Sequence, residues 1–206
     1  MNVKYNFYFW GPLLFKTKLS KEDLQKIKKL CKKNPKRSHV ERLAGHIDDE
    51  YTIDEKKVNK IIWHYTNAFR DAFFKWYNRP VNEIIADQAW VNYMKAGDFN
   101  PVHVHNGCNF SSVLYLDIPK KLQKEIKEYK GTSEGPGSIS FMFGEVGQFY
   151  NSWHSFKPEA GDMYIFPFSL RHYVNAFKSK CERVSIAINF IEKGGFYDTK
   201  DKHTNI

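Results

Sequence analysis

Residues 90–117 read WVNYMKAGDFNPVHVHNGCNFSSVLYLD, and the rest of the chain is organised around them. The centre of this stretch is a His-x-His pair, His103 and His105. Successive side chains of an extended strand alternate between its two faces, so both imidazoles are expected on the same face. Two neutral imidazoles held in this way can bind a first-row metal, although the pair alone is a weak signal.

Length and composition fit one folded domain. The chain has 206 residues, of which 42% are hydrophobic and 17% are aromatic, so it can bury a core. No apolar run approaches the roughly 20 residues of a membrane helix, and residues 1–15 carry no small-residue cleavage pattern of a signal peptide. The three cysteines are far apart and form no paired motif. We therefore expect a protein of a reducing, cytoplasmic compartment with no membrane partner.

The formal net charge of +9 is compatible with nucleic-acid binding. Much of the excess lies in residues 16–37 and 120–130, whose composition is typical of solvated helix faces. No recognised nucleic-acid motif is present, so nucleic-acid binding is a minor hypothesis, which a steep salt dependence of binding would support. The basic surface could still favour an acidic protein or a nucleic acid as substrate.

The first 80 residues predict a strand and two helices. Residues 3–15 have the composition of a strand, and a helix capped by Ser20 follows. Residues 36–52 show no clear period and are expected to form a loop. A longer amphipathic helix starts near residues 52–56 and ends before residues 78–80, because apolar residues recur at three- and four-residue intervals between them.

From residue 81 onward the sequence becomes a series of short β-rich runs separated by Gly, Pro and Asn turns. Many short strands after helices predict an α+β fold dominated by β, an antiparallel barrel or sandwich with the helices on one outer face. We expect one domain, residues 1–206, in which residues 1–80 pack on the sheet, residues 81–192 form the β core and residues 193–206 are a tail.

The second half of the chain adds a third histidine and an arginine, at a spacing that allows them to lie in one cavity. His172 follows the His-x-His pair by about 66 residues, and Arg183 comes eleven residues later. An antiparallel barrel can bring all three imidazoles to one point, with Arg183 deeper in the same cavity on the next strand. The guanidinium fork of an arginine suits a carboxylate, because its donors bind both oxygens.

This arrangement resembles the Fe(II)- and 2-oxoglutarate-dependent dioxygenases, especially their prolyl 4-hydroxylase-like branch, over about residues 82–192. It also resembles a group of uncharacterised oxygenases of bacteria and phages that carry His-x-His in this place. The resemblance implies a double-stranded β-helix (a jelly roll, cupin-like) with N-terminal supporting helices. The segments that carry it are His103-Val104-His105, Tyr115-Leu116-Asp117, Pro158-x-x-Gly161 leading into Tyr164-Ile165-Phe166-Pro167, His172 and Arg183.

The resemblance implies a role for each residue of the motif. His103 and His172 would be the two shared histidine ligands of Fe(II), and Arg183 would pair with the distal carboxylate of 2-oxoglutarate. The other residues would border the co-substrate or line the cavity: Tyr115, which would hydrogen-bond the same carboxylate, Ser185 of an Arg-x-Ser variant, Tyr93 near the metal, and Trp90, Asn92 and Asn189 as cavity lining.

The sequence departs from the family pattern at His105, where a carboxylate is the norm. A histidine makes the ligand set neutral, which removes a Coulomb attraction for Fe(II) and alters its redox potential. Three readings are open. His105 is a third ligand; or it lies behind the ligands while water, Asp98 or Glu145 completes the site; or the domain has lost catalysis.

The resemblance implies a 2-oxoglutarate-dependent dioxygenase, a hydroxylase that couples oxidative decarboxylation of 2-oxoglutarate by O2 to oxidation of another substrate. The sequence leaves that substrate open among peptides, nucleobases and small metabolites, and it indicates no oligomeric state. Two alternatives remain. One is a cupin-like three-histidine metal dioxygenase that uses no 2-oxo acid, and the other is a non-catalytic barrel that binds a metal or a carboxylate.

Overall fold

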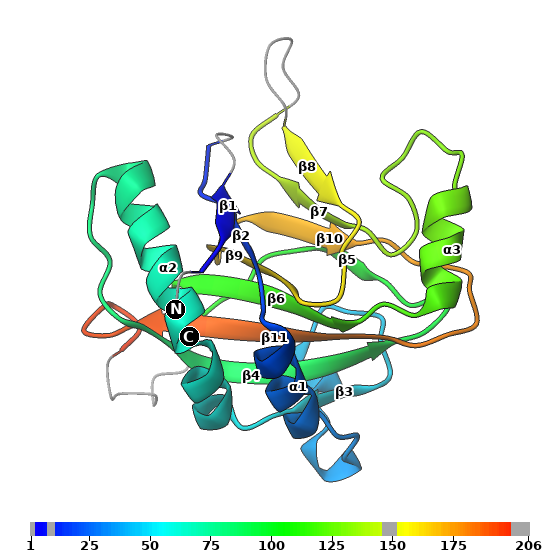
Figure 1. The fold of residues 1–206 in the computed structure, drawn as a ribbon, viewed down its shortest axis with the longest axis horizontal. Coiled ribbons are helices and arrows are strands. Elements are labelled where there is room, and N and C mark those ends of the chain that lie inside the picture. Colours follow the sequence, from blue (N-terminus) through cyan, green and yellow to red (C-terminus); the bar gives the residue numbers. More distant parts are fainter. Residues whose placement is uncertain (1–2, 8–10, 146–151, 199–206) are drawn as a thin grey trace.

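Two antiparallel sheets form the body of the molecule in the computed structural model, which describes residues 3–7, 11–145 and 152–198 (Figure 1). The large sheet has the strand order β1-β2-β9-β6-β11-β4-β3, and the small sheet has the order β5-β10-β7-β8. The strands of the large sheet are β1 (Tyr5–Phe7), β2 (Phe15–Lys18), β3 (Glu50–Thr52), β4 (Ile84–Met94), β6 (Phe110–Asp117), β9 (Asp162–Pro167) and β11 (Arg183–Glu192).

The small sheet and the helices complete the described part of the chain. The small sheet contains β5 (Asn100–His103), β7 (Ile139–Met142), β8 (Trp153–Phe156) and β10 (Arg171–Val174). The α-helices are α1 (Lys21–Leu30), α2 (Glu55–Tyr77) and α3 (Lys120–Glu128), and two 3-10 turns, η1 (Pro35–Arg37) and η2 (Val40–Arg42), lie between α1 and β3.

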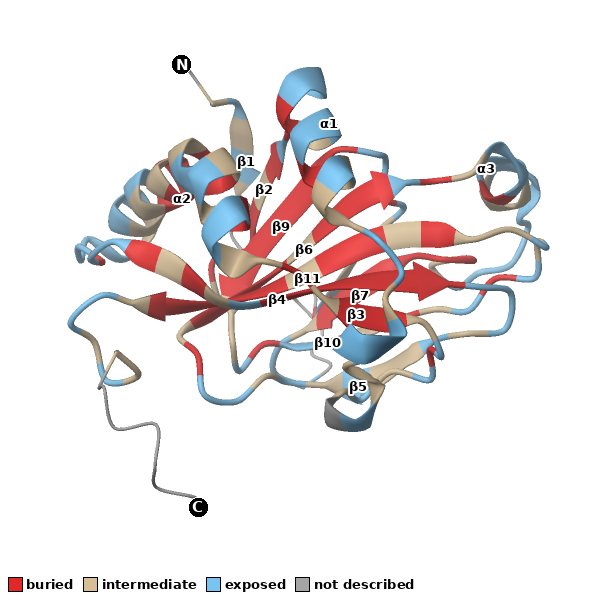
Figure 2. Cartoon of the chain, turned by 90° about the horizontal axis from the view of Figure 1, so that it is seen from below, coloured by how far each residue is buried: buried red, intermediate tan, exposed pale blue. Residues whose placement is uncertain are grey.

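The large sheet is the middle layer of the molecule. Figure 2 shows α1 and α2 above it and β5 and β10 of the small sheet below it. A helix-side core joins α2 to the upper face through residues such as Ile62, Phe69 and Ile186, and an inter-sheet core fills the space below through residues such as Phe141 and Phe166. Both faces of the large sheet are therefore covered, one by helices and the other by the small sheet. A cavity between the two sheets can lie only on the second of these faces.

Alternation along the central strands decides which residues reach the space between the sheets. In β6, Leu114 belongs to the helix-side core while Tyr115 belongs to the inter-sheet core. In β11, Ile186 and Ile188 face the helices, so Arg183 and Ser185 face the small sheet. The polar residues of β11 are thus directed inward, into the interior of the fold.

The expected helices are confirmed, with small changes at their ends. The hydroxyl of Ser20 accepts a hydrogen bond from the backbone N–H of Asp23 at 3.1 Å, which caps α1. Helix α2 ends at Tyr77, and its C-cap residue Asn78 has a left-handed φ of 49°. The predicted loop over residues 36–52 is wrong at its end, because β3 pairs there with β4. A strand of three residues is too short to show a period.

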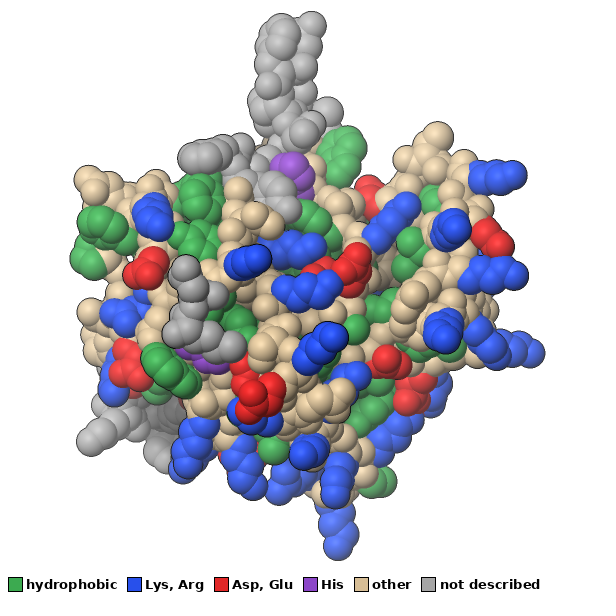
Figure 3. Space-filling model, viewed as in Figure 1, with side chains coloured by type: hydrophobic (Ala, Val, Ile, Leu, Met, Phe, Trp, Pro, Cys, Tyr) green, Lys and Arg blue, Asp and Glu red, His purple; other side chains and the backbone are tan. Residues whose placement is uncertain are grey.

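Lysine and arginine side chains are gathered on the outer surface of the molecule (Figure 3), with the buried Arg183 as an exception. Figure 3 shows lysine and arginine side chains gathered around α3 and along one edge, with acidic side chains among them. In α3 the buried side chain is that of Leu122, while its lysines are exposed. Among the described residues, no helix has the length and apolarity that crossing a membrane requires.

Phe69 of α2 gives a test of the helix-side core. Its side chain is fully buried, with its ring centroid 5.7 Å from that of Phe15 and 4.9 Å from that of Phe110. We expect Phe69→Ala to lower the free energy of unfolding by about 3–5 kcal/mol, because it leaves a cavity between α2 and the sheet. Trp63→Ala, at a position 61% exposed on the same helix, should change it by less than about 0.5 kcal/mol. Denaturant titration measures both, and equal losses would contradict this packing.

Candidate active site

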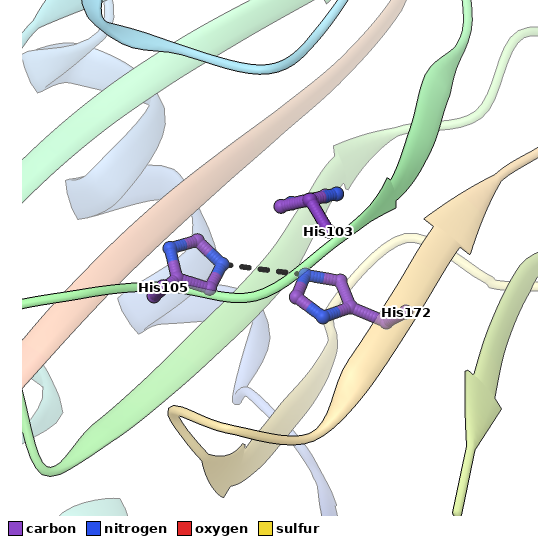
Figure 4. Close-up of side chains that lie close together, drawn as sticks. All are labelled: His103, His105 and His172. Atoms are coloured by element: carbon purple, nitrogen blue, oxygen red, sulfur yellow. Dashed lines mark hydrogen bonds between the residues drawn. The ribbon is translucent and has the colours of Figure 1, made fainter.

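Three histidines meet at the small sheet. His103 ends β5 and His172 lies in β10, where the two residues are direct cross-strand partners. His105 follows β5 by two residues, and its backbone N–H donates to the carbonyl of Phe168 at 3.0 Å. The nitrogens that could bind a metal all lie within 4.8 Å of one another. Figure 4 shows the three imidazoles pointing toward one another.

Hydrogen bonds to backbone carbonyls orient two of these rings. The Nδ1 of His103 lies 2.8 Å from the carbonyl oxygen of Pro101, and the Nδ1 of His172 lies 2.9 Å from that of Leu170. Because a carbonyl only accepts, each Nδ1 carries the hydrogen and each Nε2 keeps its lone pair. The Nε2 of His105 lies 3.3 Å from the Nε2 of His172 (Figure 4). Metal-binding histidines are commonly oriented in this way.

Burial keeps the three imidazoles neutral. Desolvation lowers the pKa of His103, and it lowers the pKa of His105 to about 3 with a smaller contribution from His103. The pKa of His172 is held well below its ordinary value by desolvation and by the two neighbouring imidazoles. Neutral imidazoles offer the lone pairs that a metal needs, so the three histidines fit a divalent first-row metal.

A cavity of about 570 Å³ lies between the sheets, and the three histidines, Arg183 and Tyr115 all line it. Arg183 is only 1% exposed. Its Nη1 donates to the carbonyl of Gly137 at 3.0 Å, while its buried Nε has no partner. Among the described residues, no carboxylate lies within ion-pair distance of this guanidinium. A buried charge without a counter-ion is costly, so the cavity fits an anion.

Tyr115 and Ser185 lie beside this guanidinium. The ring centroid of Tyr115 is 5.2 Å from Cζ of Arg183, and its buried hydroxyl has no hydrogen-bond partner. Burial raises the pKa of Tyr115 to about 12, so the hydroxyl stays protonated and can donate. Ser185 on β11 is the cross-strand neighbour of Tyr115 on β6. Two hydroxyls and a guanidinium at one end of a cavity fit a carboxylate group.

The structure brings most of the other predicted residues to the same cavity. Trp90, Asn92 and Asn189 line it, with the ring centroid of Trp90 6.1 Å from that of His105. Tyr93 is not brought there. It belongs to the helix-side core, where its ring centroid lies 6.1 Å from that of Tyr51, because residues of β4 alternate between faces and Asn92 takes the inward position.

Neither carboxylate that the sequence offered as a partner of the metal lies in the cavity. Asp98 accepts a hydrogen bond from the backbone N–H of Lys95 in the turn after β4, and Glu145 is exposed; neither lines the described cavity. Among the described residues, the metal-binding group contains the three histidines and no carboxylate. The geometry therefore favours the first of the three readings of His105.

Glu50 is a cavity residue that the sequence did not reveal. It lies in β3, is 1% exposed, and its Oε2 has no hydrogen-bond partner. Burial, helped by repulsion from Asp98, raises the pKa of Glu50 to about 7. The expected loop over residues 36–52 hid this residue, because no periodicity marks a strand of three residues.

The raised pKa of Glu50 predicts a pH dependence of stability. Between about pH 4.5 and 7 the folded chain holds a proton on Glu50 that the unfolded chain has released. The contribution of this protonated carboxyl to the free energy of unfolding is therefore complete below pH 4.5 and is lost as the pH rises through 7. The difference in the free energy of unfolding between Glu50→Gln and wild type should therefore change with pH, rising in favour of the variant by roughly 3 kcal/mol from pH 4 to pH 8. Denaturant titrations across this range measure it. A constant difference, or the same trend in Glu41→Gln at an exposed position, would contradict the assignment.

Comparisons with known proteins agree with this geometry. Residues 88–189 match the family model described as "Putative 2OG-Fe(II) oxygenase", while a search of curated proteins finds no match. The fold is similar to that of a Pseudomonas putida prolyl-4-hydroxylase, with a TM-score of 0.56 and 14% identity over 87% of this chain and 92% of that one.

Two further solved structures share the fold. One is an oxidoreductase of the 2OG-Fe(II) oxygenase family from Burkholderia pseudomallei, with a TM-score of 0.53 and 15% identity over 87% of this chain and 82% of that one. The other is a viral collagen prolyl hydroxylase from Paramecium Bursaria Chlorella virus-1 in complex with 2OG, with a TM-score of 0.52 and 16% identity over 87% and 96% of the two chains. Residues 88–189, which match the family model, include the three histidines and Arg183. The chain belongs to the 2OG-Fe(II) oxygenase family, whose members are oxidoreductases that use Fe(II), 2-oxoglutarate and O2.

Proposed function

We propose that the protein is a hydroxylase that holds Fe(II) on His103, His105 and His172 and binds the distal carboxylate of 2-oxoglutarate at Arg183. The observation that carries this proposal is the guanidinium of Arg183, which is buried without a carboxylate partner in the cavity that the three imidazoles line. A dicarboxylic co-substrate supplies the missing counter-ion while its other end reaches the metal.

Arg183 and its two hydroxyl neighbours would orient the co-substrate. The unpartnered Nε of Arg183 and the protonated hydroxyl of Tyr115 are donors on two residues that line the same cavity, and Ser185 lies between Tyr115 and Asn92 in the sheet. A carboxylate bound there accepts charge-assisted hydrogen bonds in a site that excludes water, which fixes the direction of the chain that extends toward the histidines.

His105 makes the proposed metal site a neutral three-histidine set. Fe(II) bound there together with 2-oxoglutarate would supply the centre at which O2 is activated, and the oxidation of the 2-oxo acid to succinate and CO2 would supply two of the electrons that reduce O2. Burial keeps the imidazoles neutral, and the carbonyls of Pro101 and Leu170 hold the hydrogen on Nδ1 of His103 and His172, so that Nε2 of each keeps its lone pair. The protein's contribution is positioning and exclusion of water.

The two facing antiparallel sheets would form a double-stranded β-helix over residues 81–192, with residues 1–80 packed on its outside and residues 193–206 as a tail of a single domain. Cys31, Cys108 and Cys181 are free, which supports a reducing, cytoplasmic setting.

Replacing Arg183 tests the co-substrate site. Arg183→Met should weaken binding of 2-oxoglutarate to the anaerobic Fe(II)-loaded protein by about 100-fold, because it removes the charge-assisted hydrogen bonds to the distal carboxylate. Arg171→Met, at an exposed position beside His172, is the matched control and should change the affinity by less than about twofold. Calorimetric titration measures both. Unchanged affinity in Arg183→Met would favour a three-histidine dioxygenase that uses no 2-oxo acid.

Replacing His105 tests the ligand set. His105→Ala should lower Fe(II) affinity by more than about 100-fold, the upper end of what losing an outer partner of a ligand costs. His105→Asp should bind Fe(II) more tightly than wild type, because a carboxylate restores Coulomb attraction. Anaerobic metal titration measures these affinities, with His154→Ala as the control, since His154 does not line the described cavity. A small effect of His105→Ala would instead place His105 behind the ligands.

A further inference from the structure

Four cavity-facing residues form a row across the large sheet. Ser185 on β11 pairs with Tyr115 on one side and with Asn92 on the other, and Asn92 in turn pairs with Glu50 on the edge strand β3. All four line the cavity. The proposed co-substrate site occupies the Tyr115 end of this row, so the Glu50 end remains to be explained.

The Glu50 end presents hydrogen-bond acceptors without donors. Glu50 is 1% exposed and Asn92 is 5% exposed, and a buried side-chain oxygen of each has no partner. Among the described residues, no lysine or arginine pairs with Glu50. Buried acceptors are rarely left unpaired in folded proteins, because each forfeits its hydrogen bonds to water. Two of them side by side fit a ligand that donates.

The co-substrate does not satisfy these acceptors. Neighbouring strands of a sheet lie about 4.8 Å apart, so the three steps from Tyr115 to Glu50 span about 14 Å. A five-carbon chain built from bonds of about 1.5 Å covers less than half of that span. Besides, 2-oxoglutarate carries carboxylates, which Glu50 would repel. The occupant of this end is a different molecule.

Charge in the cavity selects the kind of molecule. Three carboxylates, Glu50, Glu55 and Asp87, line it, and Arg183 is the one lysine or arginine among the described lining residues. A divalent metal on neutral imidazoles and a dianionic co-substrate cancel each other, and Arg183 adds one positive charge. With its carboxyl groups ionised the loaded cavity is therefore acidic, although the chain as a whole carries a net charge of +9. Such a cavity attracts a cation.

We infer that Glu50 and Asn92 bind a cationic nitrogen, an ammonium or a guanidinium, of the substrate that is oxidised. This inference rests on the proposed function. Asn92 is two residues from Trp90 on the same face of β4, and the ring centroid of Trp90 lies 6.1 Å from that of His105. A nitrogen held at Glu50 and Asn92 thus directs the carbon atoms attached to it along Trp90 toward the histidines.

The pKa of Glu50 supports this role. Burial and the neighbouring Asp98 raise it to about 7, so at neutral pH the group lies between its acid and its carboxylate. An incoming cation stabilises the carboxylate form and forms charge-assisted hydrogen bonds with it. Glu50 is also separate from the group of three histidines whose nitrogens lie within 4.8 Å of one another, so we assign it to the substrate and not to the metal.

The test is a binding measurement with three probes on the anaerobic Fe(II)-loaded protein saturated with 2-oxoglutarate. N-acetyl-lysine amide and N-acetyl-arginine amide carry the two kinds of cation, and N-acetyl-norleucine amide is the neutral counterpart. At least one cationic probe should bind about tenfold more tightly than the neutral probe. Glu50→Gln, which keeps the shape of the side chain, should reduce this preference to about twofold, whereas Glu41→Gln at an exposed position should leave it in place.

The outcomes separate this inference from the function on which it rests. If wild-type protein binds Fe(II) and 2-oxoglutarate but shows no preference for either cation, the inference is overturned and the proposed function stands. A preference that survives in Glu50→Gln overturns it as well, and so does loss of Fe(II) from Glu50→Gln, which would mark Glu50 as a metal ligand. If wild-type protein fails to bind 2-oxoglutarate, the proposed function fails first.

Discussion

The guanidinium of Arg183, buried without a carboxylate partner among the described residues, is the constraint on which the rest of the site depends. Arg183 is the first residue of β11, a central strand of the large sheet with β4 on one side and β6 on the other. Its partners in the described part of the chain are a backbone carbonyl and the ring of Tyr115. Desolvation of a charge in such a place works against folding. In the proposed site a carboxylate ligand restores the missing interaction, so that stability is exchanged for affinity at this position.

The two sheets divide the work of the site. The small sheet supplies His103 and His172, opposite each other on β5 and β10, and His105 follows β5 by two residues. The large sheet supplies the row that runs from Tyr115 to Glu50. Because α2 covers the other face of the large sheet, that face can be fully apolar, and polar side chains are concentrated on the face toward the cavity. Rigid strands hold both sets of groups, which favours a defined geometry.

The sequence predicts those parts of the site that depend on the spacing of residues along the chain. The intervals between His103, His172 and Arg183 predicted that these residues share a cavity, and Ser20 predicted the start of a helix. It could not choose between Asn92 and Tyr93, because β4 is buried on both faces and its pattern does not reveal which residues point inward. It missed Glu50 for another reason, since a three-residue edge strand has no period and is defined by its partner β4.

In the proposed site, three neutral imidazoles share one metal beside the guanidinium of Arg183. The most direct measurement is X-ray absorption of the anaerobic Fe(II)-loaded protein with 2-oxoglutarate, in which multiple scattering from imidazole rings counts the histidine ligands. We predict three imidazoles, and two in His105→Asp with one more oxygen neighbour. Two imidazoles in the wild-type protein would contradict this arrangement and would mean that His105 is not a ligand of the metal.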